Sequence, residues 1–316
     1  MQKRKLGKSE LEVAPLAFGG NVFGWTADEK TSFTLLDAFA DAGLNFIDTA
    51  DSYSNWVPGN KGGESETIIG NWLKQHGGRD KMLIGTKLGS ELSPDRKGLS
   101  KKYILESVEG SLRRLQTDYI DLYQSHYFDP ETPQEETLAA YDQLIKAGKV
   151  RAIGASNFTP DQLSQALKIS EKNNLPRYES LQPEYNLYDR AGFEQELELL
   201  CAQNQVGVIS YFSLAKGFLS GKYRSEADLN KSPRGGGVKA YLNERGYRIL
   251  QALDDVAQRY NSDPASVSLA WLIARASITA PIASATSSEQ LNSLIKAAQL
   301  NLDETAVNQL TEASRY

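Results

Sequence analysis

The sequence predicts an α/β fold, a (β/α)8 TIM barrel in which eight parallel strands close into a cylinder. The first observation is a rhythm along the 316 residues: short apolar runs typical of strands alternate with longer amphipathic runs typical of helices. This alternation indicates parallel strands joined by helical crossovers. The second is that there are eight such units, the number that closes a barrel. The third is the lack of a GxGxxG turn after the first strand run, which an open doubly wound sheet needs to bind a dinucleotide.

Eight strand-and-helix pairs follow one another along the chain. The predicted strands are 13–20, 45–50, 82–89, 119–127, 151–158, 178–186, 206–214 and 278–286. The predicted helices are 28–43, 64–78, 101–116, 133–149, 159–174, 191–205, 245–260 and 287–299. Gly43 and the pair Gly77–Gly78 mark the ends of the first two helices.

Several segments do not belong to this repeat. Residues 3–14 alternate apolar and polar side chains around Gly7, which predicts a β-hairpin, and we expect it to plug the N-terminal end of the barrel. Residues 264–276 and 303–313 predict extra C-terminal helices. Residues 216–244 form a long, polar, glycine-rich loop, and loops of this length are usually functional or mobile. No linker is visible, so we expect residues 1–316 to form a single domain.

The composition excludes several classes of protein. The net charge is -5 with lysine and arginine spread along the chain, so there is no clustered basic face for a nucleic acid. No run approaches the ~20 apolar residues of a membrane span, and no apolar run follows the charged N-terminus as in a signal peptide. Cys201 is the single cysteine, which favours a reducing compartment. We therefore expect a cytoplasmic protein without membrane or nucleic-acid partners.

Polar residues recur where the predicted strands end. In a parallel barrel these ends share one face, and chemistry gathers there. The residues concerned are Asp48, Lys87, His126, Ser156, Asn157, Gln182 and Tyr211, with Tyr53 just past the second strand. A lysine inside an apolar run such as IGTKLG is unusual, because lysine is almost never buried unless it is paired. Each residue alone has an ordinary structural explanation, so the indication lies in the combination.

The chemistry of this combination is specific. A phenol with a pKa of about 10 is a weak acid at neutral pH, and a nearby ammonium lowers that pKa. A carboxylate beside the lysine keeps the lysine charged, and a neutral histidine can orient a carbonyl oxygen by a hydrogen bond. Together the four groups suit proton donation to a carbonyl that receives hydride from an external cofactor.

The sequence resembles the aldo-keto reductase family over nearly its whole length. The resemblance is carried, in order, by FIDTADSY, GGESETIIGNWL, IGTKLG, YIDLYQSHYFD, GKVRAIGASNF, LQPEYNLYDR, SYFSLAKGFLSGKY and SSEQLNSL. The loop SNWVPGNKGGESE resembles the bacterial branch of the family that is also similar to potassium-channel β subunits.

The resemblance implies both an activity and a set of site residues. Asp48, Tyr53, Lys87 and His126 match the catalytic tetrad, with Tyr53 as proton donor. Ser156, Asn157 and Gln182 match the residues that hold the nicotinamide carboxamide, and Tyr211 matches the aromatic stacked on the ring. The further cofactor-binding positions are Ser213, Leu214, Lys216, Gly217 and Lys222 along the pyrophosphate, and Ser284, Ala285, Thr286, Ser287 and Gln290 near the adenosine 2'-phosphate. Gly20 and Phe212 are also expected to bind the cofactor.

Three departures from the family pattern bear on the cofactor. The family usually reads Tyr-Ser-Pro-Leu where this chain has Tyr-Phe-Ser-Leu at 211–214, so the course of the loop can differ. Residues 283–287 carry no charge, although a 2'-phosphate normally binds a cation. We therefore expect NADPH/NADP as cofactor, with NADH possible unless Lys216, Lys222 or Arg275 supplies the charge. Leu294 stands where an asparagine often meets the adenine.

The expected function is NAD(P)H-dependent reduction of small-molecule aldehydes or ketones. Aromatic residues on the loops are candidates for the substrate pocket, with loop packing as the alternative: Phe23, Trp25, Trp56, Tyr127 and Phe128. One rival hypothesis is a nucleotide-binding, redox-sensing module of the same fold. The other is a class I aldolase with Lys87 as Schiff-base nucleophile.

Overall fold

The computed structural model describes residues 2–233 and 235–316. Eight parallel strands form one sheet in the order β10-β3-β4-β5-β6-β7-β8-β9. Hydrogen bonds join its two outer segments, since the Thr279 amide donates to the Val208 carbonyl (2.8 Å) and the Ile282 amide to the Ser210 carbonyl (2.8 Å). These bonds close the sheet into a ring, so the predicted (β/α)8 barrel is confirmed.

Each predicted strand run corresponds to one barrel strand, which is shorter than the run. The strands are β3 (Ala17–Gly19), β4 (Phe46–Asp48), β5 (Leu83–Leu88), β6 (Ile120–Ser125), β7 (Val150–Ser156), β8 (Tyr178–Gln182), β9 (Gly207–Val208) and β10 (Ile282–Ala283). Of these, β7 begins one residue before its run. Pairing continues beyond β9, because the Tyr211 amide still donates to the Pro183 carbonyl at 2.9 Å. The predicted strand run 206–214 therefore stays hydrogen-bonded to the preceding run, 178–186, as far as Tyr211, one of the predicted site residues.

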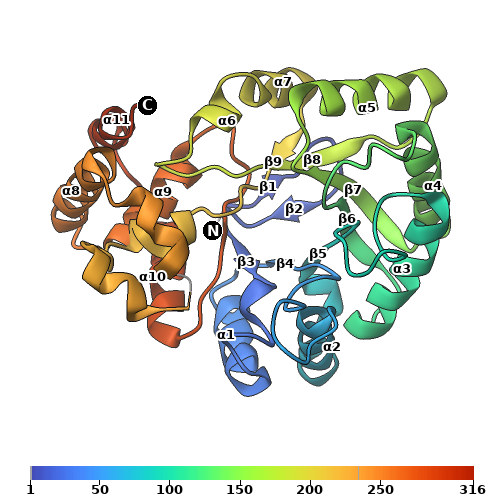
Figure 1. Cartoon of the computed structure of the whole chain (residues 1–316), viewed down its shortest axis with the longest axis horizontal. Helices are drawn as coiled ribbons and strands as arrows, with labels where there is room; N and C mark the ends of the chain where they lie inside the picture. Colours follow the sequence, from blue (N-terminus) through green and yellow to red (C-terminus); the bar gives the residue numbers. More distant parts are fainter. Residues whose placement is uncertain (1, 234) are drawn as a thin grey trace.

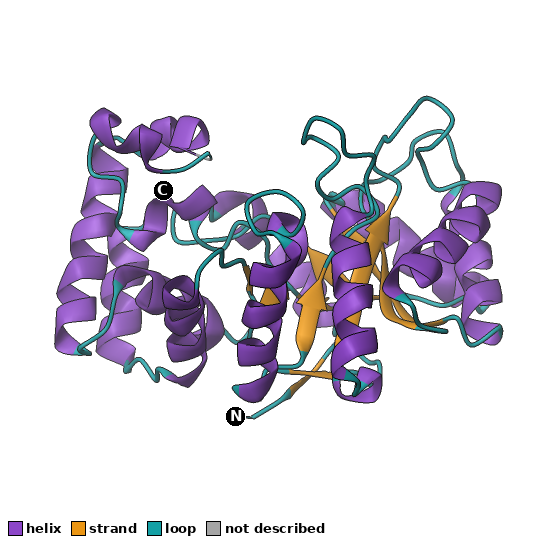
Figure 2. Ribbon diagram, turned by 90° about the horizontal axis from the view of Figure 1, so that it is seen from below, coloured by secondary structure: helices purple, strands orange, loops and turns teal. Residues whose placement is uncertain are grey.

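Helices cover the outside of the barrel, and the long loops rise from one of its ends (Figure 2). The helices of the repeat are α1 (Glu29–Asp41), α2 (Glu64–His76), α3 (Lys101–Leu115), α4 (Gln134–Lys146), α5 (Pro160–Asn173), α6 (Ala191–Glu194), α7 (Leu197–Asn204), α8 (Glu244–Arg259) and α10 (Ser288–Gln299). The side chains of Asp28, Ser100 and Ser287 cap α1, α3 and α10 by accepting hydrogen bonds from their first turns.

The sixth helix run differs from the expectation, because 191–205 forms two helices instead of one. The backbone leaves the helical region at Glu196, where φ is -135°. Beside this break the Glu194 carboxylate accepts hydrogen bonds from Arg190 Nε (2.9 Å) and from the Tyr185 hydroxyl (2.6 Å). These side-chain contacts, which come from outside α6 and α7, fix the end of α6 in place.

The N-terminal hairpin closes the bottom of the barrel. Its strands β1 (Arg4–Lys5) and β2 (Glu12–Val13) pair antiparallel. Leu6, Leu11 and Val13 are buried in the same cluster as the inward-facing apolar residues of the barrel. Those inner residues are Ala17, Phe46, Leu83, Leu122, Ala152, Ile209, Ala280 and Ile282. The predicted plug is thus present, and it fills the end of the barrel opposite the polar strand ends.

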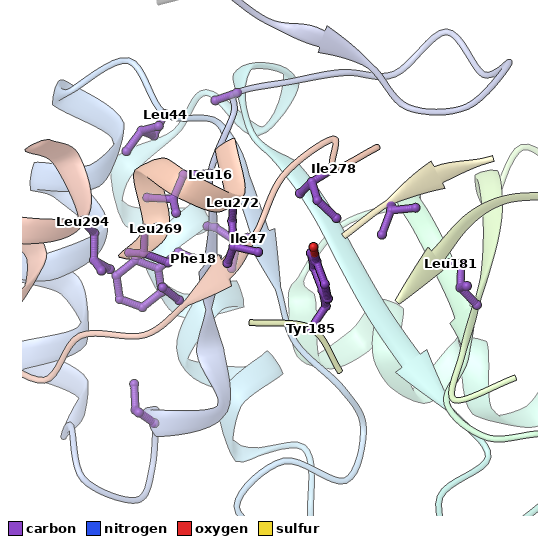
Figure 3. Packing of buried hydrophobic residues seen from close by; sticks show 14 of the residues in the cluster. Leu16, Phe18, Leu44, Ile47, Leu181, Tyr185, Leu269, Leu272, Ile278 and Leu294 are labelled. Carbon is purple, nitrogen blue, oxygen red and sulfur yellow. The ribbon is translucent and has the colours of Figure 1, made fainter. Parts of the chain in front are cut away.

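A second, larger core lies between the sheet and the helices. Leu16, Phe18 and Ile47 of the sheet side share it with Leu269 and Leu272 of α9 (Pro264–Ala274) (Figure 3). The extra helices α9 and α11 (Glu304–Ala313) were both predicted, and they lie with α8 and α10 on one side of the barrel (Figure 1). This side also carries the long loop, within which the described residues form η3 (Ala215–Ser220), η4 (Glu226–Lys231) and η5 (Gly235–Tyr241).

Candidate active site

The alternation of side chains along the strands brings the polar residues into the barrel. Successive residues of a strand point to opposite faces of the sheet. On β4, Phe46 belongs to the inner cluster and Ile47 to the outer core. The next residue, Asp48, therefore points inward, and it lies beside Gly85 in the register of β4 and β5.

The same two-residue step explains the neighbouring strands. On β5, Leu83 faces inward and Lys87 lies four residues further on. On β6, Leu122 faces inward, Gln124 lies two residues further on, and His126 follows directly after the strand. The register pairs Lys87 with Gln124, so these polar side chains reach the same level of the barrel.

Asp48 and Lys87 form a buried ion pair at this level. Lys87 Nζ donates to Asp48 Oδ1 (2.8 Å), to Asp48 Oδ2 (2.6 Å) and to the Thr49 carbonyl (2.8 Å). Both side chains are about 1% exposed. Burial lowers the pKa of the Lys87 ammonium, and the negative charge of Asp48 beside it opposes that shift.

Tyr53 returns over the mouth of the barrel and joins the pair. Its hydroxyl donates to Asp48 Oδ2 at 3.3 Å, and Lys87 Nζ lies 4.8 Å from the centroid of its ring. The ring of His126 lies 6.1 Å from that of Tyr53, measured between centroids. The structure thus brings together all four residues that were predicted as a group.

His126 is held as a neutral imidazole. Its backbone amide donates to the Leu88 carbonyl at 2.8 Å, which fixes the residue at the end of β6. Burial, with the positive charge of Lys87 as the second cause, lowers the pKa of His126 to about 3. The Nδ1 atom is buried, and no described residue makes a hydrogen bond to it.

Two glutamines complete the surroundings of Asp48, and one of them was missed in the sequence. Gln182 Nε2 donates to Asp48 Oδ1 at 2.9 Å and Gln124 Nε2 donates to the same atom at 3.2 Å. The sequence signal that could have identified Gln124 was its spacing: it lies two residues after Leu122 and two before His126, so its side chain points to the same side of the strand. Space for it comes from Gly154 on β7, where an added Cβ would lie 3.1 Å from Gln124 Cγ.

The predicted carboxamide-binding residues form a connected chain next to this site. The Tyr211 hydroxyl donates to Asn157 Oδ1 at 2.8 Å, and Asn157 Nδ2 donates to the His126 carbonyl at 3.0 Å. The Ser156 hydroxyl donates to the Gln182 carbonyl at 2.9 Å. Asn157 has a left-handed backbone (φ 59°), which turns its side chain away from the strand direction and toward His126.

Comparison with known proteins agrees with this geometry. Residues 15–315 match the model of the aldo/keto reductase family. The chain belongs to the aldo/keto reductase family. It is 36% identical to the "Uncharacterized oxidoreductase YrpG" of Bacillus subtilis (strain 168), over 99% of this chain and 95% of that protein. It is 31% identical to the "Protein tas" of Escherichia coli (strain K12), over 98% and 96%.

A third relative comes from a plant. The "Probable voltage-gated potassium channel subunit beta" of Oryza sativa subsp. japonica is 32% identical, over 94% of this chain and 91% of that protein. Membership of the family supports oxidoreductase activity on carbonyl compounds and the use of a nicotinamide cofactor. Among the helices in residues 2–233 and 235–316, none is both long and apolar enough to cross a membrane.

The loop after β9 in this aldo/keto reductase makes a tight turn through left-handed residues. Phe212, Ala215, Lys216 and Gly217 all have positive φ (49°, 47°, 57° and 98°). Within the turn the Ala215 amide donates to the Phe212 carbonyl at 2.7 Å and the Gly217 amide to the Leu214 carbonyl at 2.9 Å. Lys216 Nζ lies 5.4 Å from the Phe212 ring, and Lys222 Nζ is within 3.7 Å of where a Cβ on Gly217 would lie. Two ammonium groups therefore adjoin this turn.

The segment 284–290 carries no positive charge, and its one charged residue is Glu289. Ser284 Oγ donates to Asn21 Oδ1 at 2.6 Å, which places the segment beside η1 (Gly20–Val22). Gln290 Oε1 accepts from the Thr286 amide at 2.9 Å, so the start of α10 is already hydrogen-bonded. Leu294 is 2% exposed and belongs to the outer core.

Arg275, one of three cations considered for the 2'-phosphate, is bound elsewhere. Its guanidinium lies 3.1 Å from Glu198 and 3.6 Å from Glu194, on α7 and α6. Among the described residues, no such ion pair holds Lys216 or Lys222 on the loop after β9. Of the three, these two lysines are the better candidates.

The structure divides the predicted aromatic residues into two groups. Trp25 and Trp56 meet edge to face at 5.6 Å, Trp56 lies 6.2 Å from Tyr53, and Tyr127 stacks on His126 at 4.9 Å, all between ring centroids. Trp56 and Tyr127 are 47% and 49% exposed. These three predicted rings, of Trp25, Trp56 and Tyr127, border the site.

The other two aromatic residues pack away from the site. Phe23 is fully buried and stacks on Phe18 at 5.3 Å. Phe128 packs edge to face on Phe158 at 5.6 Å. For these two residues the contacts are those of loop packing against the outer core.

Proposed function

We propose that this protein reduces aldehydes and ketones to alcohols with NADPH, with Tyr53 as the proton donor. The observation that carries the proposal is the convergence on Asp48: the Lys87 ammonium and the Tyr53 hydroxyl both bind its carboxylate, and the neutral His126 lies next to the Tyr53 ring. A bound reduced nicotinamide would supply the hydride to the carbonyl carbon.

The proton comes from the phenol of Tyr53. The ammonium 4.8 Å from its ring favours the phenolate and so makes the hydroxyl a better acid. Asp48 keeps Lys87 charged despite its complete burial. The Tyr53 hydroxyl donates to Asp48 in this structure, and in the reaction it would donate to the developing alkoxide.

His126 orients the carbonyl. Because its pKa is lowered to about 3, the imidazole is neutral at physiological pH, so it can donate one hydrogen bond without adding a positive charge. Its ring, stacked against Tyr127, lies where a carbonyl oxygen could contact both His126 and Tyr53.

The residues present fit a nicotinamide dinucleotide. Asn157, Ser156 and Gln182 offer amide and hydroxyl groups beside the Tyr211 ring, which suits the carboxamide and ring of a nicotinamide. The turn at 212–217, with Lys216 in it and Lys222 beside it, offers two cations that suit a pyrophosphate. NADPH requires Lys216 or Lys222 at its 2'-phosphate, since residues 283–287 are uncharged; otherwise NADH binds equally well.

The bordering rings favour aromatic or otherwise flat, apolar carbonyl compounds. Trp25, Trp56 and Tyr127 would supply apolar contact and ring stacking. The test is the loss of reduced-nicotinamide absorbance when the protein is mixed with NADPH and a nitrobenzaldehyde. Substrate-dependent oxidation of NADPH supports the proposal, and its absence with both NADPH and NADH contradicts it. Parallel fluorescence titrations with NADPH and NADH measure the cofactor preference directly.

Two other functions were considered. The similarity to a rice potassium channel β subunit favours a nucleotide-binding regulatory module as the second candidate. Cofactor binding without any carbonyl turnover would be the result expected of it. The aldolase hypothesis is weakened by Lys87 itself, because all three hydrogens of its ammonium are bonded to Asp48 and Thr49. A Schiff base requires the free amine.

We further propose a single domain over residues 1–316 and a cytoplasmic location. Cys201 is a free thiol, 2% exposed, and burial raises its pKa to about 12. An unreactive, unpaired thiol is compatible with a reducing compartment.

A further inference from the structure

Asp51, on the turn between Asp48 and Tyr53, is a buried carboxyl group that the proposed mechanism does not use. It is 3% exposed, and its backbone amide donates to the Lys87 carbonyl at 3.0 Å. Its Oδ1 is buried, and no described residue gives it a hydrogen bond. A buried carboxylate oxygen without a hydrogen bond is costly, so the group favours either a nearby cation or a proton.

The cations nearby already have other partners. Asp48 takes the Lys87 ammonium. The fully buried Glu66 on α2 takes the guanidinium of Arg114 (2.6 Å), and it also accepts from the Thr86 hydroxyl (2.6 Å). The cluster thus holds three buried carboxyl groups and two paired cations, which leaves one carboxyl group, Asp51, in excess.

The elements packed around Asp51 do not change this balance. The charged and titratable groups that interact with it are Lys87 on β5, Glu66 on α2, Tyr103 and Arg114 on α3, Tyr123 on β6, Tyr141 on α4 and Arg96 on the loop after β5. The Arg96 side chain is exposed, so solvent screens it. Burial, followed by the charge of Glu66, raises the pKa of Asp51 to about 8 despite the three cations.

The loop above Asp51 packs closely on its backbone. Gly62 and Gly63 both have φ of 88°, and a Cβ on Gly62 would lie 2.8 Å from the Asp51 carbonyl oxygen. A Cβ on Gly63 would lie 2.4 Å from Cδ of Arg114. Only glycines allow this segment to lie directly over Asp51 and the Glu66–Arg114 pair.

We propose that Asp51 carries its proton at neutral pH and serves as an uncharged positioning residue behind the Lys87–Asp48 pair. With Asp51 neutral, Asp48 alone balances the Lys87 ammonium, whose charge remains effective on the Tyr53 phenol. When Asp51 ionises, a second negative charge stabilises the ammonium and opposes the phenolate, so Tyr53 holds its proton more tightly. This consequence for Tyr53 rests on the proposed function, whereas the protonation of Asp51 does not.

Infrared spectroscopy tests the protonation without any turnover. The wild type should show a protonated-carboxyl band at pH about 6 that disappears by pH about 9.5, and Asp51→Asn should lack that band. Glu184→Gln is the matched control for the half-buried Glu184, whose pKa burial also raises; it should keep the Asp51 band. If Asp51→Asn retains the band, or the wild type has none, the inference is wrong.

Stability supplies a second measurement. The folded protein keeps the Asp51 proton up to pH about 8, whereas the unfolded chain releases it near pH ~4. The folded state therefore binds more protons in this window, and its stability falls as pH rises from about 4 to about 8. The Tm of Asp51→Asn relative to wild type should rise across the same window. A constant difference would contradict the proposal.

The pH profile of carbonyl reduction separates the charge effect from a merely structural role. The alkaline limb of Asp51→Asn should move to lower pH by ~0.5 unit or more, because no ionised Asp51 then makes Tyr53 hold its proton more tightly. Asp255→Asn, an exposed carboxylate on α8, should leave the profile unchanged. An unmoved limb in Asp51→Asn overturns the link to Tyr53. A protein without any turnover refutes the proposed function, but the infrared result still decides the state of Asp51.

Discussion

At the scale of single residues, the site depends on one carboxylate that serves several partners. Asp48 accepts hydrogen bonds from Lys87, Tyr53, Gln124 and Gln182. Of these four donors, only Tyr53 is close to Asp48 in the sequence. The carboxylate is therefore held in place from four segments of the chain, which is a rigid arrangement for groups that must meet a substrate.

Removal of the Tyr53 hydroxyl tests the assignment of the proton donor. Tyr53→Phe should lower turnover by about 10²–10⁴-fold, because a positioned acid is lost. The Kd of NADPH from fluorescence titration should stay nearly unchanged, since the phenol donates a proton and provides no cofactor-binding surface. Turnover close to that of the wild type would show that another group is the acid.

The neutral state of His126 gives a prediction on stability at low pH. The folded imidazole has a pKa of about 3, and the unfolded one about 6.5. The unfolded state thus binds more protons between these values, so the wild type loses stability as pH falls below about 6.5. Relative to wild type, His126→Gln should gain about 2 kcal/mol on going from pH about 7 to about 5, measured by denaturant unfolding.

A direct titration of the same group is available because the chain has two histidines. In the variant His76→Gln the remaining imidazole signal in the NMR spectrum belongs to His126. That signal should not move between pH about 5 and about 8. A titration near pH ~6.5 would mean that His126 is accessible and charged under mild conditions.

At the scale of elements, the contact between α2 and α3 holds the site from behind. Gly70 of α2 faces the end of α3, where an added Cβ would lie 2.0 Å from the Arg114 carbonyl oxygen. Gly70→Ala should therefore destabilise the protein by about 1–3 kcal/mol, because the helices must separate. Gly192→Ala on α6 is the matched control, since nothing lies within 4 Å of its added Cβ. Equal stabilities of the two variants would contradict this account.

The alternation of strand residues made much of the site predictable, but it did not reveal every residue. The steps from Phe46 to Asp48 and from Leu83 to Lys87 are local, so the inward direction of both polar residues was predictable. Gln124 obeys the same rule but was missed, because its role needs the glycine on the neighbouring strand at Gly154. The burial of Asp51 was not predictable from its own segment, since it comes from loop residues 62–63 and from α3.

At the scale of the whole molecule, the hairpin and the site occupy opposite ends of the same interior. Leu6 is fully buried in the inner cluster at the bottom of the barrel. Leu6→Ala should cost about 2–5 kcal/mol of unfolding free energy, as for other buried leucines. Lys8→Ala, on the exposed turn of the hairpin, is the control. If Leu6→Ala unfolds like the wild type in urea, the hairpin does not contribute to the stability of the barrel.

The sequence by itself determined the eight repeating units, the inward direction of Asp48 and Lys87, and the hairpin, because each depends on local periodicity and on residues close in the chain. Only the tertiary structure decided the burial of Asp51, the hydrogen bond from Gln124 to Asp48, and the ion pairs of Arg275 with Glu194 and Glu198. The physical reason is that burial and ion pairing depend on which distant segments meet. Such contacts do not produce a periodic pattern in the sequence.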